Sequence, residues 1–183
     1  MYLTPVIIAY PWTTVRSGLN FQASTATNPF MDSEPEAGIY ARESAYLDRY
    51  VQVGVAGGRV LSVEFPTSPE ADADPNLPLL DRIEAYLEGA SADLSDVDVA
   101  MTMPTDRRRV LKAVRDVPYG DQRSVSKLAT VTSGVDDEEG HQLVRTALAE
   151  NPAPLVVPDH RVRDGPSAAP PPVEQRLRSL EGL

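Results

Sequence analysis

Alternating apolar and polar residues predict a β-hairpin in the first half of the chain. Residues 50–56 and 59–65 each carry apolar side chains at about every second position. Gly57 and Gly58 stand between these runs, and paired glycines supply the positive φ angles that a two-residue hairpin turn requires. A short apolar run at 6–10 predicts a further strand, so we expect the first part of the chain to be mostly β.

The apolar residues change to helical spacing over 77–88, a segment that Gly89 ends. The following residues, 90–104, are rich in Asp, Ser and Ala, and we expect them to link two domains. The predicted organisation is therefore an N-terminal α/β domain with an antiparallel sheet over 1–89, a linker, and a second domain over 105–183.

The second domain has the apolar spacing of several helices. Thr105 and Ser124 stand where their side chains can cap the first and the second helix. Carboxylates that complement the helix dipole open a third helix over 136–150. A strand at 155–157 and a last helix over 173–180 follow. Three helices, of which the second and third are tightly joined, are the outline of a helix-turn-helix domain, and the fold class is therefore α+β.

The charge balance is strongly acidic. The chain has 27 Asp and Glu against 17 Lys and Arg, a net charge of −10, and Lys112 and Lys127 are its only lysines. Such a surface indicates a protein kept in solution at molar salt; an ordinary acidic protein from a GC-rich genome would look the same. The acidity disfavours nucleic acid as a partner, because phosphate contacts come from Lys and Arg. At high salt this objection weakens, because counterion release then contributes little.

The cysteine and histidine content restricts the chemistry. The chain has no cysteine, which excludes disulfides, thiolate nucleophiles and zinc sites built on cysteine. Its two histidines, His141 and His160, are too few for a histidine cluster, and we expect neither a metal nor a cofactor. The N-terminus lacks the basic start of a signal peptide. No apolar run reaches the roughly 20 residues of a membrane span, so we expect a cytoplasmic protein with no membrane contact.

Short motifs in the second domain resemble the O6-alkylguanine-DNA alkyltransferases. Residues 158–162 read Pro-Asp-His-Arg-Val where that family has Pro-Cys-His-Arg-Val, and Asn151 and Pro152 precede them. The Pro-Tyr-Gly-Asp at 118–121 fits the family's order and spacing, and Glu181 begins the Glu-Gly with which the family closes its sequence. The resemblance implies a ribonuclease-H-like α/β domain followed by a winged-helix domain of the helix-turn-helix type.

In that family a cysteine thiolate accepts the alkyl group, a histidine activates it through a water, and a glutamate orients the histidine. The resemblance places His160 and Glu181 at the histidine and glutamate positions, and Asp159 at the acceptor position. A carboxylate is a much weaker nucleophile towards a methyl group than a thiolate, so we expect no alkyl transfer by this route. The tyrosine that helps to rotate the nucleotide out of the duplex aligns with Val125, and the arginine finger aligns with Gln142.

Several candidate residues have more than one interpretation. Asp159 either reads the edge of a base through its acceptor oxygens or holds its turn together by pairing with a neighbouring cation. His160 and Glu181 either retain acid–base work or form a hydrogen-bonded pair that fixes the last helix. Asn151 is expected to stabilise the turn after the third helix through bonds to backbone groups. The candidates for phosphate contacts are Arg145, Arg161 and Arg163.

The sequence favours a catalytically inactive homologue of the methylated-DNA repair proteins. Its remaining role would be non-enzymatic binding of duplex DNA with O6-alkylguanine, or of a nucleobase. One alternative is a protein-interaction module that has lost DNA binding, which an exposed apolar patch would favour. The other is a different reaction that uses Asp159 and His160, which would require an open pocket at these residues.

Overall fold

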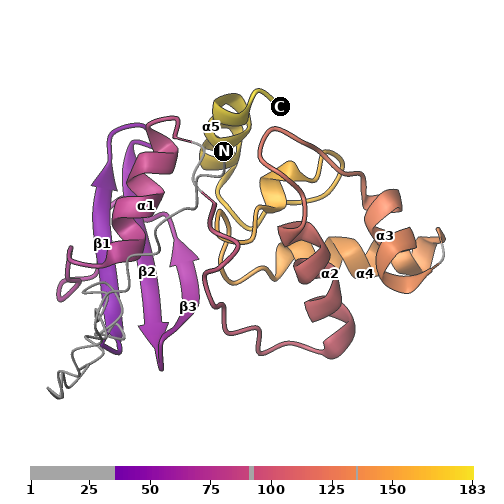
Figure 1. Cartoon of the computed structure of the whole chain (residues 1–183), viewed down its shortest axis with the longest axis horizontal. Helices are drawn as coiled ribbons and strands as arrows, with labels where there is room; N and C mark the ends of the chain where they lie inside the picture. The colour runs from indigo at the N-terminus through magenta and orange to yellow at the C-terminus, as the bar shows by residue number, and fades with distance from the viewer. Residues whose placement is uncertain (1–35, 91–92, 135) are drawn as a thin grey trace, which may run out of the picture. The chain divides into compact units, whose positions relative to one another are not determined.

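A three-stranded antiparallel sheet is the first element of the fold. The computed structural model describes residues 36–90, 93–134 and 136–183, so the strand predicted at 6–10 lies outside the described residues. The sheet consists of β1 (Gly38–Ser44), β2 (Arg49–Ala56) and β3 (Arg59–Glu64), and neighbours in sequence are neighbours in the sheet (Figure 1).

The predicted hairpin is confirmed. Gly57 and Gly58, with φ angles of 56° and 69°, form the turn between β2 and β3. The register of this pair shifts between Gly54 and Val55, as it does where a strand carries a bulge. Val51, Val53 and Val55, the alternating apolar residues of β2, are all buried, so the sequence pattern corresponds to the inward face of the strand.

The helix predicted at 77–88 is α1 (Pro78–Leu87), and it packs against β1 (Figure 1). Its buried face consists of Leu80, Ile83, Tyr86 and Leu87. At the rim of this contact, Arg42 of β1 reaches two carboxylates of the helix: its Nη1 lies 2.6 Å from Asp81 and 3.0 Å from Glu84. The outer ion pairs therefore add to a contact that apolar burial already holds.

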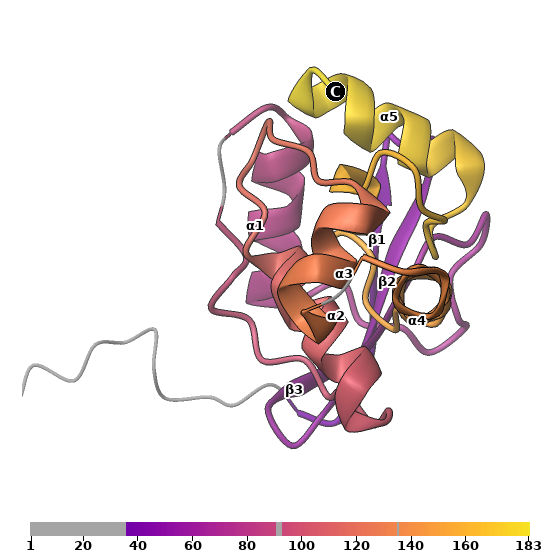
Figure 2. The ribbon, with the colours of Figure 1, turned by 90° about the vertical axis from the view of Figure 1, so that its right-hand side faces the viewer.

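Three mutually packed helices follow: α2 (Thr105–Arg115), α3 (Val125–Ser133) and α4 (Glu138–Ala149) (Figure 2). The Ser124 Oγ accepts from the Lys127 N–H at 3.1 Å, which confirms the predicted cap of α3. The cap predicted at Thr105 is wrong. The helix begins directly after Pro104, so Thr105 is already its first residue, and its hydroxyl accepts from the Arg108 guanidinium instead.

The strand predicted at 155–157 is also wrong. The chain turns back on itself there: Leu155 has a φ of 82°, and the Val157 N–H donates to the Ala153 carbonyl at 2.8 Å. Pro152 and Pro154 flank the turn, and a proline has no N–H to give to a sheet. A short 3-10 turn, η1 (Asp159–Arg161), and the last helix, α5 (Pro171–Glu181), complete the fold.

The two halves of the described chain share contacts. The N–H of Val63 in β3 donates to the Pro152 carbonyl at 2.9 Å, and Val60 forms a bridge with Val99. The described residues all lie in one compact unit, Ser33–Leu183. They form a fold of helices and one antiparallel sheet. The division into 1–89, a linker at 90–104 and 105–183 stays a prediction.

Candidate functional site

The η1 turn places three residues of the Pro-Asp-His-Arg-Val motif next to α5. The turn follows Pro158 and packs against α5. Asp159 is 1% exposed and His160 is completely buried, whereas Arg161 is partly exposed. Neighbouring side chains of the turn belong to two separate polar networks, one around Asp159 and one around Glu181.

Three donors surround the Asp159 carboxylate. The Asn151 Nδ2 and the Ala168 N–H donate to its Oδ2, at 2.8 Å and 3.0 Å, and the Ser167 hydroxyl donates to its Oδ1 at 2.7 Å. Burial raises the pKa of Asp159, and the bonds from Ala168, Asn151 and Ser167 oppose this shift only in part. The side chain thus holds the 167–168 segment over the turn, and its partners are an amide, a hydroxyl and a backbone N–H. The cation predicted as its partner is not among them.

Asn151 organises the same turn from the other side. Besides its bond to Asp159, its Nδ2 donates to the Val157 carbonyl at 2.9 Å, and its Oδ1 accepts from the Ala153 N–H at 3.1 Å. The side chain is 5% exposed. One amide therefore binds both ends of the turn that precedes η1 and also the residue at the acceptor position.

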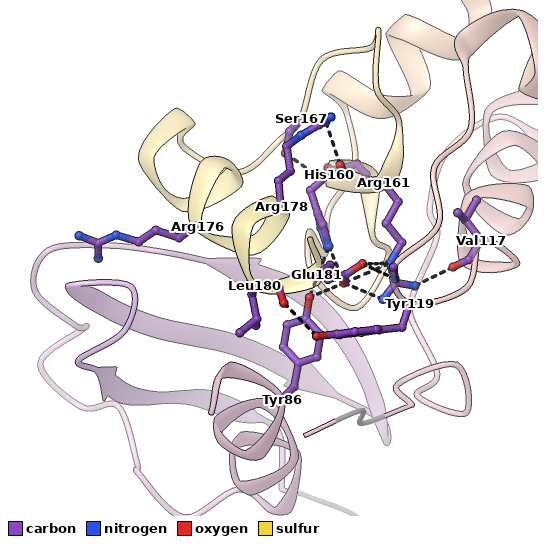
Figure 3. A network of polar contacts seen from close by, with 12 residues as sticks. Tyr86, Val117, Tyr119, His160, Arg161, Ser167, Arg176, Arg178, Leu180 and Glu181 are labelled. Carbon is purple, nitrogen blue, oxygen red and sulfur yellow. Dashed lines mark hydrogen bonds and ion pairs between the residues drawn. The ribbon is translucent and has the colours of Figure 1, made fainter. Parts of the chain in front are cut away.

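The second network is centred on Glu181 (Figure 3). The His160 Nε2 lies 3.0 Å from Glu181 Oε1, and the Tyr86 hydroxyl donates to the same oxygen at 2.5 Å. Arg161 donates to both carboxylate oxygens, from Nε to Oε2 and from Nη2 to Oε1, each at 2.8 Å. Burial opposes ionisation of Glu181, but the bonds from His160, Arg161 and Tyr86 prevail and lower its pKa to about 2.

The ionised Glu181 fixes the tautomer of His160. A carboxylate only accepts hydrogen bonds, so the Nε2 facing it must carry the proton. The Nδ1 of His160 is buried and has no hydrogen-bond partner among the described residues. The Nε2 of the ring is therefore bound to Glu181, and the Nδ1 has no partner among the described residues. The hydrogen-bonded pair predicted for His160 and Glu181 is present.

Tyr86 is a member of this network that the sequence did not single out. It comes from α1, is 2% exposed, and its pKa is raised, first by burial and then by the bond to Glu181. In sequence it looks like one more member of the apolar face of α1. Its hydroxyl was the one sign in the sequence that it also takes part in a polar contact, because a buried tyrosine oxygen needs a hydrogen-bond partner.

The residues predicted to face DNA have different surroundings. Val125 is 1% exposed at the start of α3, where its N–H donates to the Asp164 carboxylate at 2.7 Å. Arg161 points inward: it binds Glu181, and its Nη1 donates to the Val117 carbonyl at 2.6 Å. Three of its nitrogens thus donate within the protein, and a phosphate contact by this residue stays a prediction.

Gln142, Arg145 and Arg163 remain at the surface. Gln142 and Arg163 are exposed and Arg145 is partly exposed. Gln142 binds Thr146 one turn further along α4, at 3.4 Å. Within the described part of the chain, the side chains of Arg145 and Arg163 make no hydrogen bond or ion pair. These two arginines are free to meet a partner.

The described ranges contain no cluster of three or more His, Cys, Asp or Glu side chains that could hold a metal ion. None of their helices has the length and apolar character needed to cross a bilayer.

Residues 105–169 match the family model of the 6-O-methylguanine DNA methyltransferase, DNA binding domain. The chain is 32% identical over 109 residues to a methylated-DNA–protein-cysteine methyltransferase of Methanopyrus kandleri, covering 56% of this chain and 77% of the relative. A protein of the same name from Archaeoglobus fulgidus is 26% identical over 113 residues, covering 62% of this chain and 72% of the relative.

Solved structures share the fold. The O6-methylguanine-DNA methyltransferase from Pyrococcus kodakaraensis superposes with a TM-score of 0.63 at 18% identity, covering 80% of this chain and all of that one. Mycobacterium tuberculosis OGT in complex with DNA gives 0.62 at 22% identity, covering 79% of this chain and 91% of that one. At these identities the likeness shows the fold alone.

Proposed function

The chain belongs to the methylated-DNA–protein-cysteine methyltransferase family, and we propose that it is a member that binds DNA without transferring an alkyl group. The observation that carries this proposal is the state of the acceptor position. Asp159 stands there, 1% exposed, and both of its oxygens already accept hydrogen bonds. A carboxylate with its lone pairs engaged in this way is a poor nucleophile, and the chain has no cysteine to replace it.

The DNA-binding part of the proposal is supported by the matched domain and by the free arginines. The family model that matches 105–169 is that of a DNA-binding domain, and OGT of the same fold has been solved with DNA. We interpret α3 and α4 as a helix-turn-helix pair of a winged-helix domain, with α4 as the helix that approaches the groove. Arg145 on α4 and Arg163 after η1 then contact phosphates.

The proposal is tested by titrating labelled duplexes, one with O6-methylguanine and one with guanine, and measuring fluorescence anisotropy from low to molar KCl. We expect saturable binding that favours the lesion. In parallel, the intact mass of the protein is measured after incubation with the modified duplex, and no added methyl group is expected. A methyl adduct on the protein would overturn the claim of inactivity.

Two arginine variants define the surface used. Arg145→Gln and Arg163→Gln should weaken binding to both duplexes, and each should make the negative slope of log K against log salt shallower by about 1. Arg82→Gln is the matched control, because Arg82 lies on α1, outside the matched domain, and pairs with Asp96. Absence of binding at every salt concentration would contradict the proposal and leave the protein-interaction module as the better interpretation.

A further inference from the structure

A cavity of about 390 Å³ lies beside the Glu181 network. The cavity is lined by the end of α1, residues 93–95, the residues after α2 and the turn at 155–158. Neither Asp159 nor His160 lines it. Its volume is within the range of natural small-molecule sites, and none of its lining residues belongs to α4. The inference therefore goes beyond the proposed function and does not rest on it.

Aromatic rings form one wall of the cavity. Tyr86 and Tyr119 meet edge to face, with ring centroids 6.0 Å apart and an angle of 86° between the rings. The Arg161 guanidinium lies over the Tyr119 ring, 5.9 Å from its centroid. Tyr119 is 36% exposed, so part of its surface is open to a ligand. Figure 3 shows that Tyr86 and Arg161 reach the Glu181 carboxylate, whereas the Tyr119 hydroxyl reaches the Leu180 carbonyl.

Donors and acceptors are both present on the remaining walls. The Arg115 Nη2 donates to the carbonyls of residues 94, 95 and 97, which fixes the guanidinium and leaves its other nitrogens free to donate. Asp93 and Asp116 are exposed and line the same cavity. The charge of Arg161 is neutralised by Glu181, so the two aspartates outweigh Arg115 and the site disfavours an anion.

We propose that this cavity binds a neutral, planar heterocycle of the nucleobase or nucleoside type. Such a ligand has a flat face that can stack on a tyrosine ring and an edge with both donors and acceptors. A guanidinium and two carboxylates complement that edge. A purely apolar ligand would make no hydrogen bond to the free nitrogens of Arg115 or to the two aspartates, and a nucleotide would bring a negative phosphate to a site of net negative charge.

The imidazole of His160 can report whether a ligand occupies the cavity. Tyr86 and Arg161 line the cavity and both bind Glu181, which in turn binds His160. The chain contains only two histidines, and the other, His141, lies on α4 and pairs with Asp136. A ligand that contacts Tyr86 and Arg161 should therefore shift the imidazole resonances of His160 and leave those of His141 unchanged.

The test uses the full chain and NMR of its two imidazoles during titration with guanosine, adenosine, cytidine and uridine. We expect at least one nucleoside to shift the His160 signals saturably, and its 5′-monophosphate to bind more weakly. Tyr119→Ala should weaken the nucleoside about tenfold, because it removes the stacking surface, whereas Tyr119→Phe should retain binding.

Tyr46→Ala is the matched control. Tyr46 is 38% exposed, and its hydroxyl donates to a backbone carbonyl of α5, as that of Tyr119 does. Its replacement should leave nucleoside binding unchanged. The proposal is overturned if no nucleoside moves the His160 signals, if Tyr46→Ala weakens binding as much as Tyr119→Ala, or if monophosphates bind as tightly as nucleosides. None of these outcomes depends on duplex binding, so the two proposals fail separately.

Discussion

At the scale of single residues, Asp159 is a buried acid whose ionisation opposes folding. Its pKa is raised above the usual 3.8, mainly by burial. An acid with a higher pKa in the folded state keeps its proton up to a higher pH there than in the unfolded chain. Its contribution to stability is therefore greatest below about pH 4 and falls as the pH rises through the folded pKa.

Asp159→Asn should be at least as stable as the wild type at pH 7. The amide oxygen can accept from Asn151 and Ala168, and the amide nitrogen can donate to the Ser167 hydroxyl, so all three contacts survive without the charge. Asp159→Ala, the comparison, leaves the donors of Asn151 and Ala168 unpaired and should cost about 1–3 kcal/mol. Urea unfolding from pH 4 to 8 measures both; equal losses in the two variants would contradict this account.

The pKa of Glu181 is shifted in the opposite direction from that of Asp159. Its pKa falls from the usual 4.5 to about 2, so its contribution to stability is fully present above about pH 4.5 and is lost as the pH falls towards 2. The difference in unfolding free energy between the wild type and Glu181→Gln should therefore be largest above pH 5 and shrink in acid. Glu174→Gln serves as the control, because Glu174 makes only a partly exposed 3.7 Å pair with Arg178 on the same helix. A constant difference for Glu181→Gln would refute this assignment.

At the scale of elements, the cap of α3 can be tested alone. Ser124→Ala removes the oxygen that accepts from the Lys127 N–H, and we expect a loss of about 1 kcal/mol in the free energy of unfolding. Thr130→Ala lies on the exposed side of the same helix, where its hydroxyl binds the Ser126 carbonyl, and it should be close to neutral. If thermal unfolding shows equal effects of the two changes, the cap does not stabilise the helix.

The elements that could be predicted are those whose local pattern agrees with their packing. The β2–β3 hairpin has both alternation and a glycine turn, and α1 has a single apolar face. β1 was not assigned, because only Tyr40 and Ala41 of its seven residues are buried, so the strand hardly alternates. The turn at 155–157 was misread as a strand because Leu155, Val156 and Val157 are all buried; burial alone does not distinguish a strand from a buried turn.

The candidate site was predictable only as far as its residues are close in sequence. The sequence identified Asn151, Asp159 and His160 because one short segment carries all three. Tyr86 joins Glu181 from 95 positions away, and no periodicity relates two such positions. Arg161 was assigned to phosphate because its charge is visible in sequence, whereas its inward direction depends on where α5 places Glu181.

At the scale of the whole molecule, excess negative charge remains after the ion pairs have formed. Several arginines pair with carboxylates, among them Arg42, Arg82 and Arg107, but 17 basic residues cannot neutralise 27 acidic ones. The remaining carboxylates repel each other in the compact state more than in the unfolded chain. Salt screens this repulsion, with a Debye length that falls from about 30 Å at 0.01 M to about 3 Å at 1 M.

The urea midpoint of unfolding should therefore rise steadily from 0.01 M to 1 M KCl. A variant that combines Glu43→Gln, Glu64→Gln and Glu88→Gln removes three exposed negative charges; it should be more stable than the wild type at 0.01 M KCl and gain less from added salt. A wild-type midpoint that stays flat or falls with salt would mean that the acidic surface does not oppose folding. The negative charge would then bear on solubility alone, because repulsion strong enough to matter in the folded state must respond to screening.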